Sequence, residues 1–406
     1  MGREEGRYPL QPALEACPNP MDETAAHQIL NSPPTVYEFE MERAHDEHEP
    51  LAIGERDTLH WALNELAIHV FEVMLKELGV SETLALLRPR VRYSGRVLAR
   101  NFAARFNLES GSLEAIAFAP FCARCLIWGG KGKLTFYERG AINEFVACPM
   151  SQGPPEICIA LSHYVGEGVS EEMNPDFEVV YTHHMTQGDP CCVGVCRRKD
   201  ELGIDAEHLG TKLRVVESLD IGEKEMDALS FNEEVHMLNI LLESFLESIS
   251  ADRVSQLLSP AFKALGEEAG RRAKSVLKES NLATTPDSIL MTWGEMLGQA
   301  YEVKDVKQGG LETSLSGCIC CHSPMTVCDL MESFLAGMIS AVSPGTSVLF
   351  VKCKDASHDA CSIVFQPELN KIESASDPLV ALKMRFVNGE ISEEEYRRKR
   401  AVLLER

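Results

Sequence analysis

Apolar side chains recur at helical spacing over the early part of the chain. The stretch LHWALNELAIHVFEVMLKEL at 59–78 places an apolar residue every three to five positions, which predicts a helix with one buried face. Gly79 suits the end of that helix, and a second helical region follows at 81–106. Residues 1–56 show no such period and contain several prolines, so we expect a flexible N-terminal arm there.

Two later stretches favour strands. FEVVYTHHM at 177–185 and SVLFVKCK at 347–354 are rich in β-branched and aromatic residues, and each is followed by turn residues and a second apolar run. Pro154 and Pro324 precede these hairpins and suit the first position of a helix. Helices followed by strands, a helix and a hairpin predict an α+β fold with an antiparallel sheet, not alternating βαβ units.

The same landmarks recur about 170 residues apart, in the same order. LLRP at 86–89 matches LLSP at 257–260. The other matched pairs are Gly95 and Gly266, Cys148 and Cys318, Pro154 and Pro324, Cys158 and Cys328, His184 and Cys353, and Cys192 and Cys361. The separation between matched residues changes slightly along the chain, and one-residue gaps in the alignment of the two copies account for these changes. The pattern predicts an internal duplication.

The repeat divides the chain into parts. We expect one module at 57–200 and a second module at 230–368, joined by a connecting segment at 201–229. A separate helical hairpin is expected at 375–406. Such a short hairpin buries little surface alone, so it should dock or associate.

Charge and apolar content narrow the class of protein. The chain has 39 Lys and Arg against 62 Asp and Glu, a formal net charge of −23, which argues against a nucleic-acid or anionic-membrane surface. No apolar run is long enough to span a membrane, and no signal-peptide core is present, so we expect a cytoplasmic protein. In such a protein, 14 cysteines are more typical of metal ligands, redox thiols or buried thiols than of disulfides.

Each copy offers four soft ligands for a metal. They are Cys148, Cys158, His184 and Cys192 in the first copy, and Cys318, Cys328, Cys353 and Cys361 in the second. If Gly188 and Ser357 centre the turns, the last two ligands of each set face one another about 5 Å apart across two strands. Both sets suit zinc, and the second also suits an iron–sulfur cluster. The alternatives are buried core thiols, or a disulfide between Cys353 and Cys361.

Three residues of the first copy are candidates for catalysis. Cys158 falls near a predicted helix N-terminus, where a thiol can be partly ionised. His183 stands beside a predicted metal ligand and is the best candidate for a base, and Asp189 lies in the hairpin turn. Cys122 and Cys125 form a CxxC pair that suits redox chemistry or half of a metal site.

The first copy resembles the L-2-amino-thiazoline-4-carboxylic acid hydrolase-like family. The resemblance rests on Cys148-Pro149, a following helix, and a hairpin with Gly188-Asp189 and Cys192. The second copy looks more like the related 4-vinyl-reductase ligand-binding domains, whose hairpin cysteines bind zinc in some members; Cys353 and Cys361 match them. The first copy departs from that pattern at His184. These resemblances imply a duplicated small-molecule module with divided roles.

The tail has its own resemblance. DPLVALKMRFVNGEISEEEYRRKRAVLLE at 377–405 resembles the short C-terminal domain called SHOCT, with Ser392 and Glu395 forming a capping box at its second helix. The resemblance implies oligomerisation or contact with a protein partner.

Three functions remain open from the sequence. The first is a hydrolase-like protein that opens a C–N or related bond of a small molecule with a metal- or thiolate-assisted site. The second is a non-catalytic sensor that binds a small molecule or metallocofactor and contains structural zinc. The third is a metal or redox handling protein, suggested by the dense thiols of the second copy.

Overall fold

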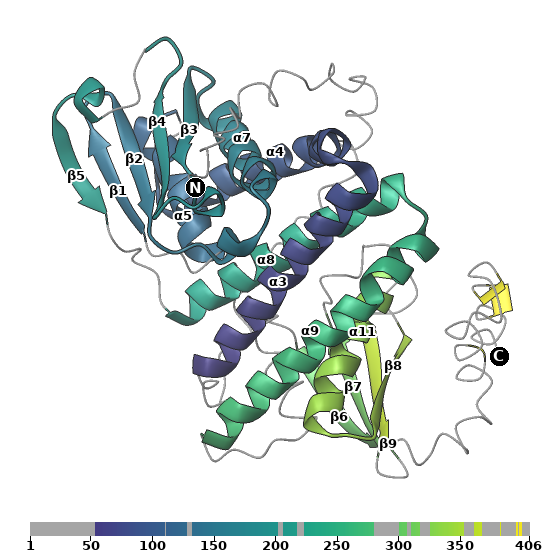
Figure 1. Cartoon of the computed structure of the whole chain (residues 1–406). Coiled ribbons are helices and arrows are strands. Elements are labelled where there is room, and N and C mark those ends of the chain that lie inside the picture. Colours follow the sequence, from purple (N-terminus) through teal and green to yellow (C-terminus); the bar gives the residue numbers. More distant parts are fainter. Residues whose placement is uncertain are drawn as a thin grey trace, which may run out of the picture.

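The structure of the protein is a computed structural model (Figure 1). It describes residues 53–109, 111–127, 132–201, 206–216, 223–279, 300–306, 310–316, 325–352 and 361–367, and five positions between 382 and 399. The predicted arm at 1–56 therefore lies almost wholly outside the described residues, as does most of the predicted C-terminal hairpin.

Three helices open the described chain. They are α3 (Ile53–Leu78), α4 (Val80–Arg105) and α5 (Leu113–Ile127). Gly79 separates the first two with φ of 83°, a left-handed value that glycine adopts without strain. The two helices predicted from the apolar period are thus found, and the first begins several residues earlier than predicted.

Five antiparallel strands form the first sheet. They are β1 (Gly132–Tyr137), β2 (Gly140–Phe145), β3 (Phe177–His183), β4 (Cys192–Arg198) and β5 (Lys212–Val216), in the order β3-β4-β2-β1-β5. Helix α5 packs on β1, β2 and β4. Strand β5 belongs to the segment predicted only to connect the modules, yet it extends the first sheet (Figure 1).

Short helical elements connect β2 to β3. They are η1 (Pro149–Gln152), α6 (Glu156–Cys158), η2 (Ile159–His163) and α7 (Tyr164–Met173). Two further single turns, η3 (Met185–Gln187) and η4 (Ala206–Leu209), follow β3 and β4. The helix predicted to begin at Pro154 begins at Glu156, because Pro154 and Pro155 supply the carbonyls that accept the first turn's N–H groups.

The described elements of the second half follow a similar order, without a described counterpart of α5 or β5. Helices α8 (Glu223–Ser248) and α9 (Ala251–Glu279) lead to β6 (Ala300–Val306), β7 (Gly310–Ser316), α11 (Met325–Val342), β8 (Thr346–Lys352) and β9 (Cys361–Pro367). The strand order β8-β9-β7-β6 repeats the order β3-β4-β2-β1 of the first sheet. The protein is therefore an α+β protein with antiparallel sheets, as the sequence predicts.

Each half contains one very close helix crossing that requires glycine. A Cβ atom on Gly168 of α7 would lie 2.0 Å from the carbonyl oxygen of Arg92 on α4. In the second half, a Cβ on Gly337 of α11 would lie 2.1 Å from the carbonyl oxygen of Lys263 on α9. Backbone cannot yield by that much, so glycine is needed at both crossings.

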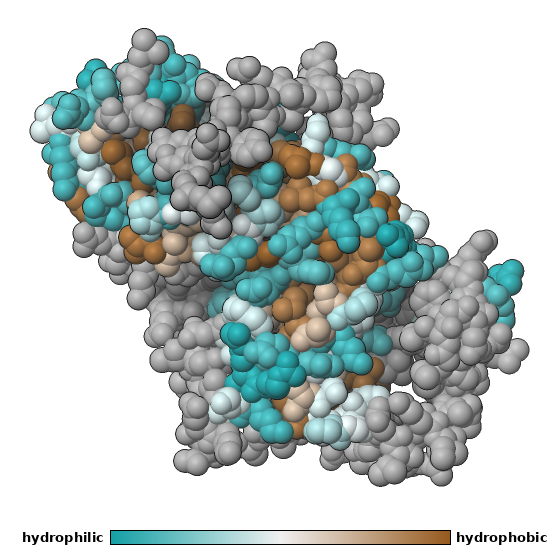
Figure 2. All heavy atoms as spheres, viewed as in Figure 1, coloured by the Kyte–Doolittle hydropathy of each residue, from teal (hydrophilic) through white to brown (hydrophobic). Residues whose placement is uncertain are grey.

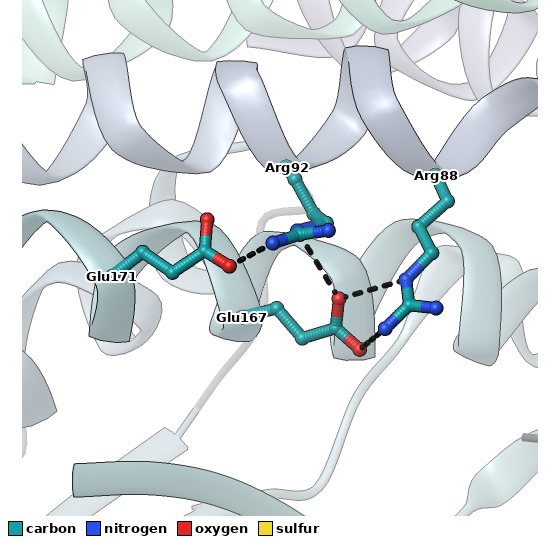
Figure 3. A network of polar contacts seen from close by, with 4 residues as sticks. All are labelled: Arg88, Arg92, Glu167 and Glu171. Carbon is teal, nitrogen blue, oxygen red and sulfur yellow. Dashed lines mark hydrogen bonds and ion pairs between the residues drawn. The ribbon is translucent and has the colours of Figure 1, made fainter. Parts of the chain in front are cut away.

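Ion pairs join the same two helices in the first half. Figure 3 shows Glu167 on α7 between two arginines of α4, with Arg88 Nε and Nη2 at 3.1 and 3.2 Å from its carboxylate oxygens. Arg92 reaches Glu167 at 3.4 Å and also pairs with Glu171. These side chains are about one-third exposed, so each pair adds little to stability and mainly fixes how the helices lie.

The two halves pack through their first helices. Helix α3 lies beside α8 and α9, and apolar side chains gather along the seam between α3 and α9 (Figures 1 and 2). At the crossing of α3 and α8, Asn64 Nδ2 donates to Glu234 at 3.2 Å, and His60 Nδ1 lies 2.7 Å from the same carboxylate. Among the described residues, no helix is long and apolar enough to cross a bilayer.

Candidate functional site

A buried arginine stands at the centre of the first half. Arg124 lies near the end of the apolar helix α5 and is only 4% exposed. Its guanidinium stacks on the rings of Tyr181 and Phe145, 4.8 and 5.0 Å from their centroids, and donates a 2.5 Å hydrogen bond to Ser162 Oγ. Burial alone would lower the pKa of Arg124, but the surrounding tyrosine and thiols raise it on balance. The side chain is therefore a fixed cation.

Three cysteines surround this cation. Cys148, Cys158 and Cys192 all interact electrostatically with Arg124. They come from different elements: Cys148 precedes η1, Cys158 ends α6, and Cys192 begins β4. Cys158 and Cys192 are buried, whereas Cys148 is half-buried. None of the three forms a disulfide in this structure.

Several groups favour a negative charge on the sulfur of Cys192. Interaction with the Cys148 thiol and with the positive charge of Arg124 favours the thiolate form of Cys192. The backbone N–H of Met185, in the hairpin turn, donates from 3.3 Å. The Cys148 hydrogen bond is the largest cause that lowers the pKa of Cys192, to about 5, against the opposing effect of burial. Of the two thiols, Cys192 is thus the one whose ionised form is favoured.

The two other thiols remain protonated. The same hydrogen bond raises the pKa of Cys148, and burial raises the pKa of Cys158. Cys158 Sγ lies 3.1 Å from Thr186 Oγ1 in the hairpin turn. The cluster therefore favours one thiolate and two thiols, and the nearby arginine balances the single negative charge.

Two histidines complete the cluster. The rings of His163 and His184 stack with centroids 5.3 Å apart, and His163 also contacts the Tyr181 ring at 5.0 Å. Burial lowers the pKa of both, that of His163 to about 3, so both rings are neutral at pH 7. His163 Nε2 and both ring nitrogens of His184 are buried without a hydrogen-bond partner among the described residues. Such nitrogens favour a polar ligand or water beside them.

A π-helical turn places part of this site. Residues Ile159–His163 form the π-helix η2 between α6 and α7, and Ser162 and His163 both lie in it. The π-turn includes one more residue than an α-turn, and such turns are common at functional sites. The matching helix α11 is α-helical throughout, without such a turn.

The hairpin turn explains where the predicted residues lie. His183 lies opposite Val193 in the register of β3 and β4, and His184 and Cys192 are the next residues toward the turn. Gly188, with φ of 91°, closes the turn. Asp189 accepts the backbone N–H of His184 at 2.8 Å, so this predicted catalytic residue holds the turn in place.

His183 faces away from the cluster. Neighbouring residues of a strand point to opposite faces, and His184 is buried while His183 is exposed, with its ring 3.0 Å from Thr182 Oγ1. Of the three predicted catalytic residues, only Cys158 has its side chain in the cluster. Glu167, another titratable residue of this region, is engaged by Arg88 and Arg92.

The predicted zinc ligands of the first copy meet around a cation. In the part of the chain that the structure describes, no group of three or more His, Cys, Asp or Glu side chains has the geometry to hold a metal ion. The Arg124 guanidinium stands among the three thiols and would repel a divalent cation. The described residues of the first half, with a fixed cation among the thiols, therefore do not fit zinc.

The second copy's predicted ligands are only partly placed. Cys328 is buried in α11. Cys361 begins β9 and Cys353 follows β8, but the side chain of Cys361 and all of Cys318 and Cys353 lie outside the described residues. Zinc or an iron–sulfur cluster at that site, and the alternative disulfide, stay predictions. Cys122 of the CxxC pair is buried and forms no disulfide, and the side chain of Cys125 is not described.

Arg124, the residue that organises the site, was not a candidate in the sequence. A signal for it was present, because it is a cation within LEAIAFAPFCARCLI, an otherwise strongly apolar helix. A charged group in such a position must be paired or hydrogen-bonded. Ser162 and Thr186 gave no such signal, since their roles depend on the π-turn and the hairpin turn.

Comparison with known proteins identifies one segment of the chain. The family model for the short C-terminal domain SHOCT matches residues 377–404, as the sequence predicts. No curated protein and no solved structure matches the chain. The comparisons give no support to the resemblance of the two modules to the hydrolase-like or 4-vinyl-reductase families.

Proposed function

We propose that the first half of the protein is a hydrolase-like module that acts on a small non-peptide molecule through the thiolate of Cys192. The observation that carries the proposal is the setting of the Cys192 sulfur: the N–H of Met185 donates to it from 3.3 Å, and the Cys148 thiol and the buried Arg124 favour its ionised form. A thiolate, unlike a thiol, is an effective nucleophile. The nucleophile is therefore Cys192, in place of the predicted Cys158.

The chemistry would follow the pattern of other thiol nucleophiles. Cys192 attacks an electrophilic carbon, a C–N, C–O or related bond breaks, and water then releases the acyl group from the sulfur. The Cys148 thiol is positioned to give its proton to the leaving group. The neutral rings of His163 and His184 supply unpartnered nitrogens that suit hydrogen bonds with a polar substrate.

We further infer that the chain is a duplication in which the first copy carries the chemistry. The repeated strand order and the two glycine crossings support this inference. The separation of equivalent residues also falls from 170 between Cys158 and Cys328 to 169 between Gly168 and Gly337. The first copy thus has one extra residue between Cys158 and Gly168, in the segment that contains the π-helix η2.

A chromogenic ester tests the nucleophile and the turnover separately. We expect p-nitrophenyl acetate to release a burst of nitrophenolate and to leave an acetyl group on Cys192, followed by slower steady release as water deacylates the sulfur. The burst and the acetyl group should be absent in Cys192→Ser. Cys196→Ser is the matched control, since Cys196 is buried on the same strand and burial strongly raises its pKa.

Two results would count against the proposal. Acetylation of other residues with Cys192 unmodified would remove it as the nucleophile. Acetylation of Cys192 without steady release, across a panel of small esters, thioesters and cyclic amides, would favour the sensor function instead. The unpartnered nitrogens of His163 and His184 favour that second function, in which a small molecule binds without turnover.

A further inference from the structure

Two of the clustered thiols come from chain segments that the first sheet brings together. Each of them, Cys148 and Cys192, is the largest influence on the pKa of the other. Their backbones come together because Phe145, three residues before Cys148, pairs directly with Cys192 in the register of β2 and β4. The first sheet thus fixes the position of Cys192. The chain that leaves β2 of the same sheet carries Cys148 three residues further on.

Accessibility differs between the two thiols. Cys192 is fully buried, whereas Cys148 is half-buried, between the end of β2 and η1. A bulky reagent such as glutathione disulfide therefore meets Cys148 first, whereas small esters and iodoacetamide need less room to reach Cys192. The third thiol, Cys158, is engaged with Thr186 Oγ1 at 3.1 Å, which turns it toward the hairpin.

We propose that Cys148 and Cys192 form a reversible disulfide by exchange with a low-molecular-weight disulfide, with Cys148 as the outer thiol that reacts first and Cys192 as the resolving thiol. The proposal shares Cys192 with the proposed function but does not require turnover. If the proposed function holds, the disulfide also switches it off, because it consumes the nucleophile.

The exchange balances in two steps. The proton between the two sulfurs moves to Cys192, and the Cys148 thiolate attacks one sulfur of glutathione disulfide, releasing one glutathione thiolate. Cys192 then loses its proton to solvent and attacks Cys148, which breaks the mixed disulfide and releases the second glutathione. The protein loses two electrons, glutathione disulfide gains them, and reduced glutathione in excess reverses both steps.

Oxidation would also change the charge at the centre of the module. The thiolate of Cys192 is an anion beside buried Arg124, and a disulfide has no charge. The oxidised protein would therefore hold a buried guanidinium without its sulfur anion, which is costly in a medium of low polarity. We expect the oxidised form to be less stable than the reduced form, the reverse of the usual effect of a disulfide.

The test uses the full chain and glutathione buffers of graded ratio. After equilibration, free thiols are blocked under denaturing conditions, and the chain is cut with a protease specific for glutamate. Cleavage at Glu144, Glu156, Glu167, Glu178 and Glu201 puts Cys148, Cys158 and the group Cys191, Cys192 and Cys196 on three separate peptides. Mass spectrometry then identifies which peptides are linked.

We expect the Cys148 peptide linked to the Cys192 peptide in the wild-type protein, with the link lost on return to reduced glutathione. The link should persist in Cys158→Ser, Cys191→Ser and Cys196→Ser, and it should disappear in Cys192→Ser. Fragmentation of the linked peptides from the wild-type protein assigns the bond to Cys192 as against Cys191 or Cys196, so a poorly folded variant does not leave the proposal open.

Three outcomes would overturn the proposal: glutathione adducts without any link, a link that requires Cys158, or a link that requires Cys191 in place of Cys192. The acetylation assay distinguishes this failure from failure of the proposed function. Steady release of nitrophenolate without a link would leave the hydrolase-like function standing, and a link without acetylation would leave only the redox pair.

Discussion

At the scale of single residues, the properties of the site follow from one buried cation. Arg124 cannot lose its proton in a protein, so its burial requires a nearby anion or hydrogen-bond acceptors. Tyr181 and Phe145 provide ring faces, Ser162 provides an oxygen, and Cys192 provides the negative charge. The arginine and the thiolate thus stabilise one another, which no single residue type in the sequence would indicate.

The reactivity of Cys192 should reflect this pairing. We expect the rate of Cys192 alkylation by iodoacetamide to fall to half of its value at high pH near pH 5. The thiolate is the reactive form, and the pKa of Cys192 is lowered to about 5. In Arg124→Met the midpoint should rise by about one to three pH units. Alkylation is measured by mass spectrometry of the native protein after short exposures over a range of pH.

Arg124→Lys is the control for Arg124→Met, since it keeps the positive charge and should keep most of the lowering of the Cys192 pKa. Cys196 gives an internal comparison, because burial raises its pKa and it should stay unmodified throughout. A midpoint for Cys192 near that of an ordinary thiol in the wild-type protein would contradict the assignment.

At the scale of elements, glycine decides how closely helices pack. The crossing of α4 and α7 brings backbone to backbone at Gly168, and the crossing of α9 and α11 does so at Gly337. The ion pairs around Glu167 then fix the first of these crossings (Figure 3). The close approach also holds the π-helix η2, which directly precedes α7, against the cysteine cluster.

Substitution of either crossing glycine should be strongly destabilising. In Gly168→Ala or Gly337→Ala, the added methyl group meets a carbonyl oxygen near 2 Å and forces the helices apart. We expect a loss of about 1–3 kcal/mol in the free energy of unfolding, the usual cost of overpacking. Urea denaturation followed by circular dichroism measures it.

Ser170→Ala, on α7 close to Gly168, is the matched control, because it removes a buried hydroxyl that has no hydrogen-bond partner among the described residues. It should have little effect or be slightly stabilising. Equal stability of the glycine variants and the wild-type protein would show that the helices can separate without cost.

At the scale of the whole molecule, the two halves are joined by a buried polar contact. Asn64 of α3 hydrogen-bonds to Glu234 of α8, and the two helices come from different halves of the chain. The ion pairs of Arg90 with Glu243 and of Arg253 with Glu77 lie on the same interface.

This contact should make stability depend on pH. Burial raises the pKa of Glu234 from its ordinary value of 4.5 to about 7, more than the hydrogen bonds from His60 and Asn64 lower it. Between these values the folded protein keeps a proton that the unfolded chain has lost. The free energy of unfolding should therefore fall as pH rises from 4.5 to 7, by on the order of 1–3 kcal/mol.

Urea denaturation at pH 4.5 and pH 8 would detect this dependence by comparison with Glu234→Gln, in which it should be absent. Glu247→Gln, on the same helix with a half-exposed side chain, should behave as the wild-type protein does. Identical pH dependence in wild type and Glu234→Gln would mean that the carboxyl group is ionised in the folded state.

The tail matched by the SHOCT model should control assembly and not chemistry. We expect removal of 375–406 to lower the mass of the particle in light scattering to that of one chain, because a short helical pair buries little surface unless it associates. The pH profile of Cys192 alkylation should be unchanged. An unchanged particle mass would exclude the tail as the element of assembly.

Much of the architecture could be predicted from local patterns. The helical period predicted the first two helices, and the β-branched runs predicted both hairpins. The order of these elements predicted the α+β class. The tail was recognisable because its turn and capping box are contiguous in sequence. The sequence did not predict β5, because this strand is short and exposed and so has no alternation of apolar and polar residues. It did not predict the π-turn either, because a single extra residue in a helix produces no recognisable sequence pattern.

The sequence by itself determined which residues carry soft chemistry, and it placed His184 and Cys192 at the two ends of one turn, because pairing in a hairpin is local. Only the tertiary structure decided what surrounds them. Arg124 comes from a helix 24 residues before Cys148, and its position among the three thiols depends on how α5 packs on the sheet. Long-range packing thus placed an arginine among the predicted metal ligands, since a local pattern cannot specify which distant charge is buried beside a thiol.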